Sequence, residues 1–178
     1  MTYKKTLFLC VMCLLSAILL FAYMKEWLII RLPQVHTHII NESHITKQQV
    51  SLWYWRQNRW HHEKTELLSS HSVSDNISQL VSALLVLFEE EKLVDKKVTL
   101  QSVTLSSDGM TAFISLDRSP MSKQASVYIK LMMIESILKT LRENGIKIQK
   151  VQFLTHHQPM QDMHLDFSNS WVISGFLA

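Results

Sequence analysis

The residues best suited to chemistry or binding lie in one short segment, SLWYWRQNRWHH, which runs from Ser51 to His62. It combines three tryptophans, a tyrosine, two arginines and two histidines. Indole rings beside guanidinium groups can stack on the bases of single-stranded nucleic acid, and histidines can ligate a metal. Tryptophan and arginine also concentrate in the hot spots of protein interfaces. Three hypotheses follow: a nucleic-acid surface, a metal site and a protein-binding surface.

The charge balance argues against a nucleic-acid partner. The formal net charge is +3, and the 18 basic and 15 acidic residues are intermixed along the chain. A groove for single strands normally combines stacking rings with a continuous positively charged track. We therefore expect no nucleic-acid partner. We predict a protein-binding surface made of Trp53, Trp55, Arg56, Arg59 and Trp60. Burial of these indole rings in a sheet is the structural alternative.

A metal site is the second hypothesis, because the chain has nine histidines, two pairs of which are adjacent, His61–His62 and His156–His157. Adjacent residues of a strand point to opposite faces, so His61 and His62 cannot both reach one ion from a strand. The chain also lacks an H-E-x-x-H motif and a cysteine–histidine set with ligand spacing. We therefore expect no bound metal.

No pattern in the sequence marks a catalytic centre. A nucleophile elbow is absent, and three glycines in the whole chain are too few for a glycine-rich phosphate loop. We predict no catalytic residues, no cofactor and no enzyme activity. One alternative stays open, a metal-dependent hydrolase or metal-binding protein that uses the His-rich C-terminal loop with His156, His157, His164 and Asp166.

The N-terminal part of the chain predicts attachment to a lipid bilayer. The segment Leu7–Met24 is almost entirely apolar, with Ser16 as its one clearly polar residue. A helix of about 20 apolar residues spans the hydrocarbon core of a bilayer. We therefore predict a transmembrane anchor over residues 6–30, after a short N-terminal segment, residues 1–5. A cleaved signal peptide remains the alternative.

The charges that flank the apolar segment do not by themselves decide the orientation of this anchor in the membrane. Lysines lie on both sides of the apolar segment, at Lys4–Lys5 and at Lys25. An N-terminal signal anchor usually leaves the C-terminal domain outside the cytoplasm, and we adopt that orientation in the cytoplasmic membrane. Residues 31–46 are polar without helical periodicity and are predicted to be a tether. Residues 47–178 would then form the folded domain.

Two hairpins are predicted from alternation and turn chemistry. Apolar side chains alternate from Val50 to Trp55, which is the period of a strand with one more buried face. Residues 56–58 would form the turn into a returning strand, residues 59–68. Asp108–Gly109 tolerates the positive φ angles of a tight turn and predicts a second hairpin. A shift of apolar phase predicts a bulge near Gln101.

Helical spacing of apolar residues predicts two helices, and the remaining apolar segments predict further strands. The expected strands are residues 50–55, 59–68, 97–105, 110–117, 150–154 and 164–167, and the expected helices are residues 73–93 and 123–144. This order, ββαββαββ, predicts the α+β class. We expect an N-terminal transmembrane helix followed by a two-layer domain, with two helices packed on one face of a mostly antiparallel sheet.

The element order and two local patterns resemble the GerMN domain, which occurs in sporulation and spore-germination proteins and in other bacterial envelope proteins. The resemblance covers residues 50–171. The segment Val103–Leu116, VTLSSDGMTAFISL, looks like the family's strand–Asp–Gly–strand hairpin. The segment His164–Trp171, HLDFSNSW, looks like its closing Gly-His-x-Asp-x-Ser motif, although Met163 stands where the family tends to have glycine.

This resemblance implies a non-catalytic domain that takes part in protein assemblies outside the cytoplasmic membrane. It implies structural roles for the turn residues Asp108 and Gly109 and for the closing residues His164, Asp166 and Ser168. We therefore predict a membrane-tethered interaction or structural module of a bacterial cell envelope. Its partners would be the bilayer, through Leu7–Met24, and other envelope proteins or further copies of the chain.

Overall fold

The computed structural model describes Tyr3, Met12 and residues 47–176. The chain separates into two compact units, Met1–Asn41 and Glu42–Ala178, and the fold is described for the second. Apart from Met12, the predicted anchor and tether lie outside the described residues. Within the described residues, no helix has both the length and the apolar character needed to cross a membrane.

The second unit contains two helices and seven strands among its described residues. The elements are β1 (Lys47–Arg56), β2 (Arg59–Leu68), α2 (Val73–Glu90), β3 (Leu100–Leu105), β4 (Thr111–Leu116), α3 (Val127–Glu143), β5 (Lys150–Thr155), β6 (Gln158–Pro159) and β7 (Trp171–Val172). β1 and β2 form a two-stranded sheet. The larger sheet has the order β3-β4-β5-β6, and β7 also pairs with β5. The predicted α+β class is confirmed.

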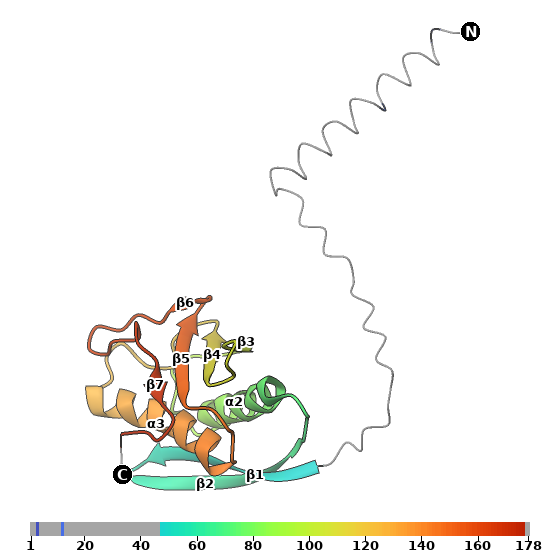
Figure 1. The fold of residues 1–178 in the computed structure, drawn as a ribbon. Coiled ribbons are helices and arrows are strands. Elements are labelled where there is room, and N and C mark those ends of the chain that lie inside the picture. Colours follow the sequence, from blue (N-terminus) through green and yellow to red (C-terminus); the bar gives the residue numbers. More distant parts are fainter. Residues whose placement is uncertain (1–2, 4–11, 13–46, 177–178) are drawn as a thin grey trace. The chain divides into compact units, whose positions relative to one another are not determined.

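The two helices lie between the two sheets, so the domain has three layers and the predicted two-layer arrangement is wrong (Figure 1). The physical reason lies in α3, whose residues from Met132 to Leu138 are all buried. A helix that is buried around its whole circumference needs a cover on both sides. The hairpin provides the second cover through Val50 and Leu52, which are 5% and 4% exposed.

The larger sheet is mixed. Its β3–β4 pairing is antiparallel, as predicted for that hairpin, and the β5–β6 and β5–β7 pairings are antiparallel too, but the central β4–β5 pairing is parallel. Parallel neighbours need a crossover connection, and α3 provides it between β4 and β5. The predicted bulge is confirmed, because the β3–β4 register shifts between Leu100 and Ser102.

The end of the chain differs from the prediction. Residues 164–167 do not form a strand, and the short strands there are β6 and β7. The reason is local hydrogen bonding by two aspartates. Asp162 Oδ1 accepts the N–H of His164 over 2.9 Å, and Asp166 Oδ1 accepts the N–H of Ser168 over 2.8 Å. Such side-chain bonds favour turns over sheet ladders.

Serine side chains set the start of each helix. Ser72 caps α2 by accepting the N–H of Asp75, and Ser126 caps α3 by accepting the N–H of Ile129. The second cap places the start of α3 four residues later than predicted, at Val127 instead of Lys123. The first turn of α3 lies beside the β1–β2 hairpin, and its residues Tyr128 and Ile129 are exposed.

Candidate functional site

The predicted binding residues meet at the tip of the β1–β2 hairpin. The register pairs Trp55 with Trp60 and Arg56 with Arg59, on either side of a two-residue turn. Side chains alternate between the faces of a strand. Trp53, Trp55 and Trp60 therefore lie on the outer face, whereas the two arginines share the inner face with the core residues. The structure brings the five residues together but divides them between two faces.

An aromatic cluster covers the outer face and extends onto α3. The rings of Trp55 and Trp60 meet edge to face with centroids 5.2 Å apart. Tyr128 packs edge-on against Trp55 at 6.1 Å, and the Lys139 ammonium lies 4.5 Å from the ring centroid of Trp53. Edge-to-face and cation–π contacts are both favourable. The cluster therefore holds together residues from three elements.

Side chains of α3 also hold the edge of β1. Thr140 Oγ1 accepts the backbone N–H of Trp53 over 2.9 Å. Asn144 Oδ1 accepts the N–H of Ser51 over 3.0 Å, and Asn144 Nδ2 donates to the carbonyl of Ser51 over 2.8 Å. These bonds satisfy backbone groups that would otherwise be unpaired at a strand edge. The aromatic cluster is thus fixed to a buried helix.

Burial of the tryptophans is partial. Trp53, Trp55 and Trp60 are half-buried, and the indole nitrogens of Trp53 and Trp55 are covered without a hydrogen-bond partner. The neighbouring α3 residues Tyr128 and Ile129 are 49% and 43% exposed. The exposed apolar area therefore extends from the hairpin onto the first turn of α3.

Sequence reasoning did not include Tyr128, Ile129 or Lys139 in this surface. Tyr128 and Lys139 are eleven residues apart, which is about three helical turns and places them on one helix face. That spacing could have shown that they share a face. It could not have shown that this face lies beside the hairpin, because the contact joins elements distant in sequence.

A pocket of about 220 Å³ lies at the hairpin tip, between the end of α2 and the start of α3. Its lining is Trp55, Arg56, Gln57, Asn58, Phe88, Leu93, Ile129, Met132, Met133 and Ser136. Arg56 forms an ion pair with Glu91. Arg59, across the strand pair, donates from Nε to His61 Nε2 over 3.2 Å. Within residues 47–176, Arg59 has no carboxylate at ion-pair distance.

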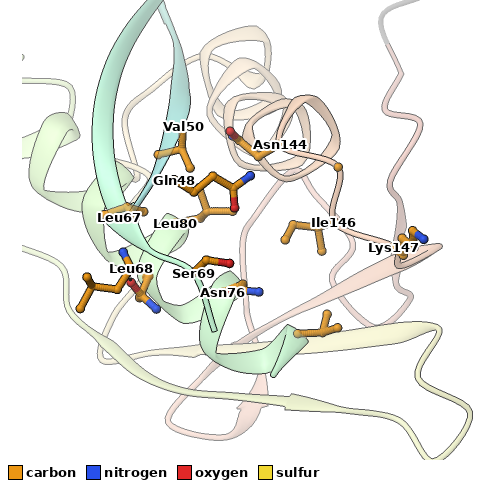
Figure 2. A pocket seen from close by; sticks show the side chains of 13 residues that line it. Gln48, Val50, Leu67, Leu68, Ser69, Asn76, Leu80, Asn144, Ile146 and Lys147 are labelled. Carbon is orange, nitrogen blue, oxygen red and sulfur yellow. Dashed lines mark hydrogen bonds between the residues drawn. The ribbon is translucent and has the colours of Figure 1, made fainter. Parts of the chain in front are cut away.

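A second hollow lies at the base of the hairpin (Figure 2). It measures about 290 Å³, and Lys147 is the one titratable side chain of its lining. Two side-chain amides of its lining already bond the backbone. Asn76 accepts the N–H of Ser70 and donates to the carbonyl of Ser70, and Gln79 accepts the N–H of Leu68. Without an acid–base pair in its lining, this hollow gives no basis for catalysis.

The predicted turn residues Asp108 and Gly109 lie in the β3–β4 loop. Gly109 has a φ of +71°, and its N–H donates to the carbonyl of Ser106 over 2.9 Å. Asp108 Oδ1 accepts the N–H of Met110 over 2.9 Å. Hydrogen bonds, first from the Ser106 hydroxyl and then from Met110, hold the pKa of Asp108 below its ordinary value. Both residues lie in the turn, and the structural role implied by the resemblance stays a prediction.

The closing residues lie in the loop before β7. Asp166 Oδ1 accepts the Ser168 hydroxyl over 2.6 Å, and this bond lowers the pKa of Asp166. His164 Nδ1 lies 3.5 Å from Lys130 Nζ. Lys130 was not singled out from the sequence, yet it is buried in α3 and pairs with Asp162. The helical pattern alone gives no signal for a buried lysine.

The residues of the metal alternative are not gathered in one place. His156 and His157 form the β5–β6 turn, where Gln101 Nε2 lies 3.1 Å from His156 Nδ1. His164 lies in the loop before β7, with its Nδ1 3.5 Å from the Lys130 ammonium and 3.8 Å from the Asp162 carboxylate. Among the described residues, no group of three or more histidine, cysteine, aspartate and glutamate side chains could hold a metal ion. The described geometry offers this alternative no support.

No family model matches this chain, and no curated protein matches it. Solved structures with a similar fold include two bacterial proteins. One is a candidate lipoprotein from Clostridium perfringens, with 20% identity, a TM-score of 0.47, and coverage of 72% of this chain and 89% of that one. The other contains the tandem GerMN domains of the sporulation protein GerM from Bacillus subtilis. It has 15% identity and a TM-score of 0.46, and the match covers 68% of this chain and 44% of that one. At these scores, membership of the GerMN family stays a prediction.

Proposed function

We propose that this chain is a non-catalytic protein-interaction module of a bacterial cell envelope, and that it binds its partner through the hairpin tip. The observation that carries the proposal is the aromatic cluster around Trp55 and Trp60, which continues into the exposed side chains of Tyr128 and Ile129. Binding hot spots are enriched in tryptophan, tyrosine and arginine. An aromatic surface on a rigid helix and hairpin needs little ordering on binding.

The cellular setting of the proposal comes from the sequence. The apolar segment Leu7–Met24 is long enough for a membrane anchor. The segment His164–Trp171 and the hairpin around Asp108–Gly109 resemble GerMN domains of envelope proteins. In this proposal the anchor lies in the cytoplasmic membrane, and the domain is held outside the cytoplasm among other envelope proteins or further copies of the chain.

Photo-crosslinking in intact cells tests the proposal. A photoreactive amino acid replaces His62, an exposed residue whose ring lies tilted against that of Trp53 with centroids 4.7 Å apart. The matched control carries the same group at Glu90, which is exposed at the end of α2. We expect a discrete protein adduct at position 62 and none at position 90. The same adducts at both positions, or none at position 62, would contradict the proposal.

A further inference from the structure

The pocket at the hairpin tip has room for one large side chain. Its volume of about 220 Å³ exceeds that of an engineered apolar cavity of about 150 Å³ that binds benzene. Ile129 on its wall is 43% exposed, so the pocket reaches the surface. The void leaves lining atoms without contacts on one side, and a ring or a branched aliphatic group would supply those contacts.

The pocket interior selects for an apolar occupant. Phe88, Leu93, Met132 and Met133 form much of its wall. Ser136 also lines it, but the Ser136 hydroxyl already donates to the carbonyl of Met132 over 2.7 Å. The Ser136 hydroxyl can still accept a hydrogen bond, but the four apolar side chains offer a polar group of an occupant no partner, and an unpaired buried polar group is costly. The two methionines can adjust to different apolar shapes, because their side chains are flexible and polarizable.

Two arginines lie at the hairpin tip beside the pocket. Arg56 lines it and is paired with Glu91. Arg59 faces Arg56 across the strands, and within residues 47–176 no carboxylate lies within ion-pair distance of it. The charge of Arg56 is thus balanced by Glu91, whereas Arg59 is an unbalanced cation on the strand opposite the pocket residue Arg56. A carboxylate on the occupant would complement this cation.

We propose that this pocket binds a segment of a partner protein in which one aromatic or branched aliphatic side chain enters the pocket and a neighbouring carboxylate pairs with Arg59. The inference rests on the proposed function and specifies the chemistry of the partner. It predicts that the partner contacts two faces of the hairpin tip, the aromatic outer face and the pocket.

Methyl NMR of the full chain tests this inference, with carbon-13 in the methionine methyl groups. Met132 and Met133 line the pocket, whereas Met110 and Met163 are exposed elsewhere and serve as internal controls. The probe is the peptide acetyl-Glu-Phe-Glu-amide. Its phenyl ring is expected to shift the signals of Met132 and Met133 and to leave those of Met110 and Met163 unchanged.

Two further peptides separate the parts of the inference. In acetyl-Glu-Ala-Glu-amide the ring is absent, and no shift at Met132 or Met133 is expected. In acetyl-Lys-Phe-Lys-amide the charge is reversed, and the Kd is expected to be weaker by about fivefold or more, the factor that corresponds to one exposed ion pair at the upper end of its usual range. Arg59→Glu is expected to remove this preference for the acidic peptide.

A matched pair of variants locates the binding. Ile129→Trp would fill the pocket and is expected to abolish the shifts at Met132 and Met133. Val127→Trp is the control, because Val127 is 40% exposed on the same turn of α3 but does not line the pocket. The folded state of each variant is checked by the signals of Met121 and Met160, which are buried in the core and do not line the pocket.

Several outcomes would overturn the inference. The first is that the acidic phenylalanine peptide shifts neither the Met132 nor the Met133 signal. The second is that the acidic and basic peptides bind with equal affinity. The third is that Ile129→Trp and Val127→Trp lose these shifts to the same extent. Shifts caused by octanoate but by none of the peptides would assign the pocket to a fatty acid instead. These results are separable from the crosslinking at His62: an adduct there without peptide binding would refute the pocket inference alone, and peptide binding without an adduct would refute the proposed function.

Discussion

Lys130 and Asp162 form a buried ion pair that joins the first turns of α3 to the C-terminal loop. Lys130 Nζ donates to Asp162 Oδ2 over 2.6 Å, and the two side chains are 0% and 8% exposed. The other carboxylate oxygen accepts the N–H groups of His164 and Leu165. The loop that carries the closing motif is therefore held by a charge pair that the sequence pattern did not indicate.

Asp162→Asn is expected to destabilise the domain. Removing one member of a buried pair leaves the other charge uncompensated, which typically costs about 3 kcal/mol or more. Urea unfolding followed by tryptophan fluorescence measures the free energy of unfolding. Asp95→Asn is the control, because Asp95 is exposed, and we expect a change within about 0.5 kcal/mol. Equal effects of the two substitutions would contradict the importance of the pair.

The effect of Asp162→Asn should depend on pH. Burial raises the pKa of Asp162, but the hydrogen bonds from Lys130 and the His164 N–H, with the charge of Lys130, outweigh it and hold the pKa below 3.8. Because the pKa is lower in the folded state, the ionised carboxylate stabilises the fold above about pH 4 and loses this contribution as the pH falls through the folded-state pKa. Unfolding measured between pH 7 and pH 2 is expected to show the difference between wild type and variant shrinking below about pH 4. A constant difference would be inconsistent with this linkage.

Thr140→Val tests the attachment of the hairpin to α3. Valine keeps the shape of threonine but removes the acceptor for the Trp53 N–H, whose bond to Thr140 Oγ1 measures 2.9 Å. A buried donor without a partner costs about 1–3 kcal/mol. We expect the free energy of unfolding to fall by that amount. Thr104→Val, at an exposed position of β3, provides the comparison, and a similar loss there would refute the assignment.

Two glycine substitutions should differ in cost. In Gly109→Ala the new Cβ would have no atom within 4 Å, so the cost comes mainly from the φ of +71°. We expect the free energy of unfolding to fall by about 1 kcal/mol. Gly175→Ala has a φ of +76° and would also place its Cβ against the Glu135 carboxylate, which is buried and accepts the N–H of Phe176 over 3.2 Å. We expect about 3 kcal/mol for this second change. Thermal unfolding of both variants gives the comparison, and equal midpoints would argue against the tail packing on α3.

Tyr128→Ser is expected to weaken partner capture without unfolding the domain. Tyr128 is 49% exposed and packs on Trp55, so its loss removes contact area at the proposed interface. Truncation of an aromatic hot spot costs about 2 kcal/mol of binding free energy, and the yield of the His62 adduct should fall accordingly. Val86→Ser on α2, with Val86 51% exposed, is the control. An unchanged yield of the His62 adduct in Tyr128→Ser would show that α3 is not part of the interface.

Local patterns predicted most of the elements. The alternation from Val50 to Trp55 and the Asp108–Gly109 turn placed both hairpins near their observed positions, because strand periodicity and turn chemistry act over a few residues. The bulge between Leu100 and Ser102 was also visible as a phase shift. The loop at residues 164–167 was predicted as a strand instead. Its aspartate side chains bond the backbone in turns, and alternation alone cannot distinguish such a loop from a strand.

The sequence by itself determined which residues could form a binding surface, because their types and strand period are local properties. The same strand period separates the tryptophans from the arginines. Only the tertiary structure decided that α3 completes the aromatic cluster and that a pocket opens at the hairpin tip. The physical reason is distance along the chain: the bond between Trp53 and Thr140 spans 87 residues. Such contacts depend on how buried faces pack together, and no local pattern contains that information.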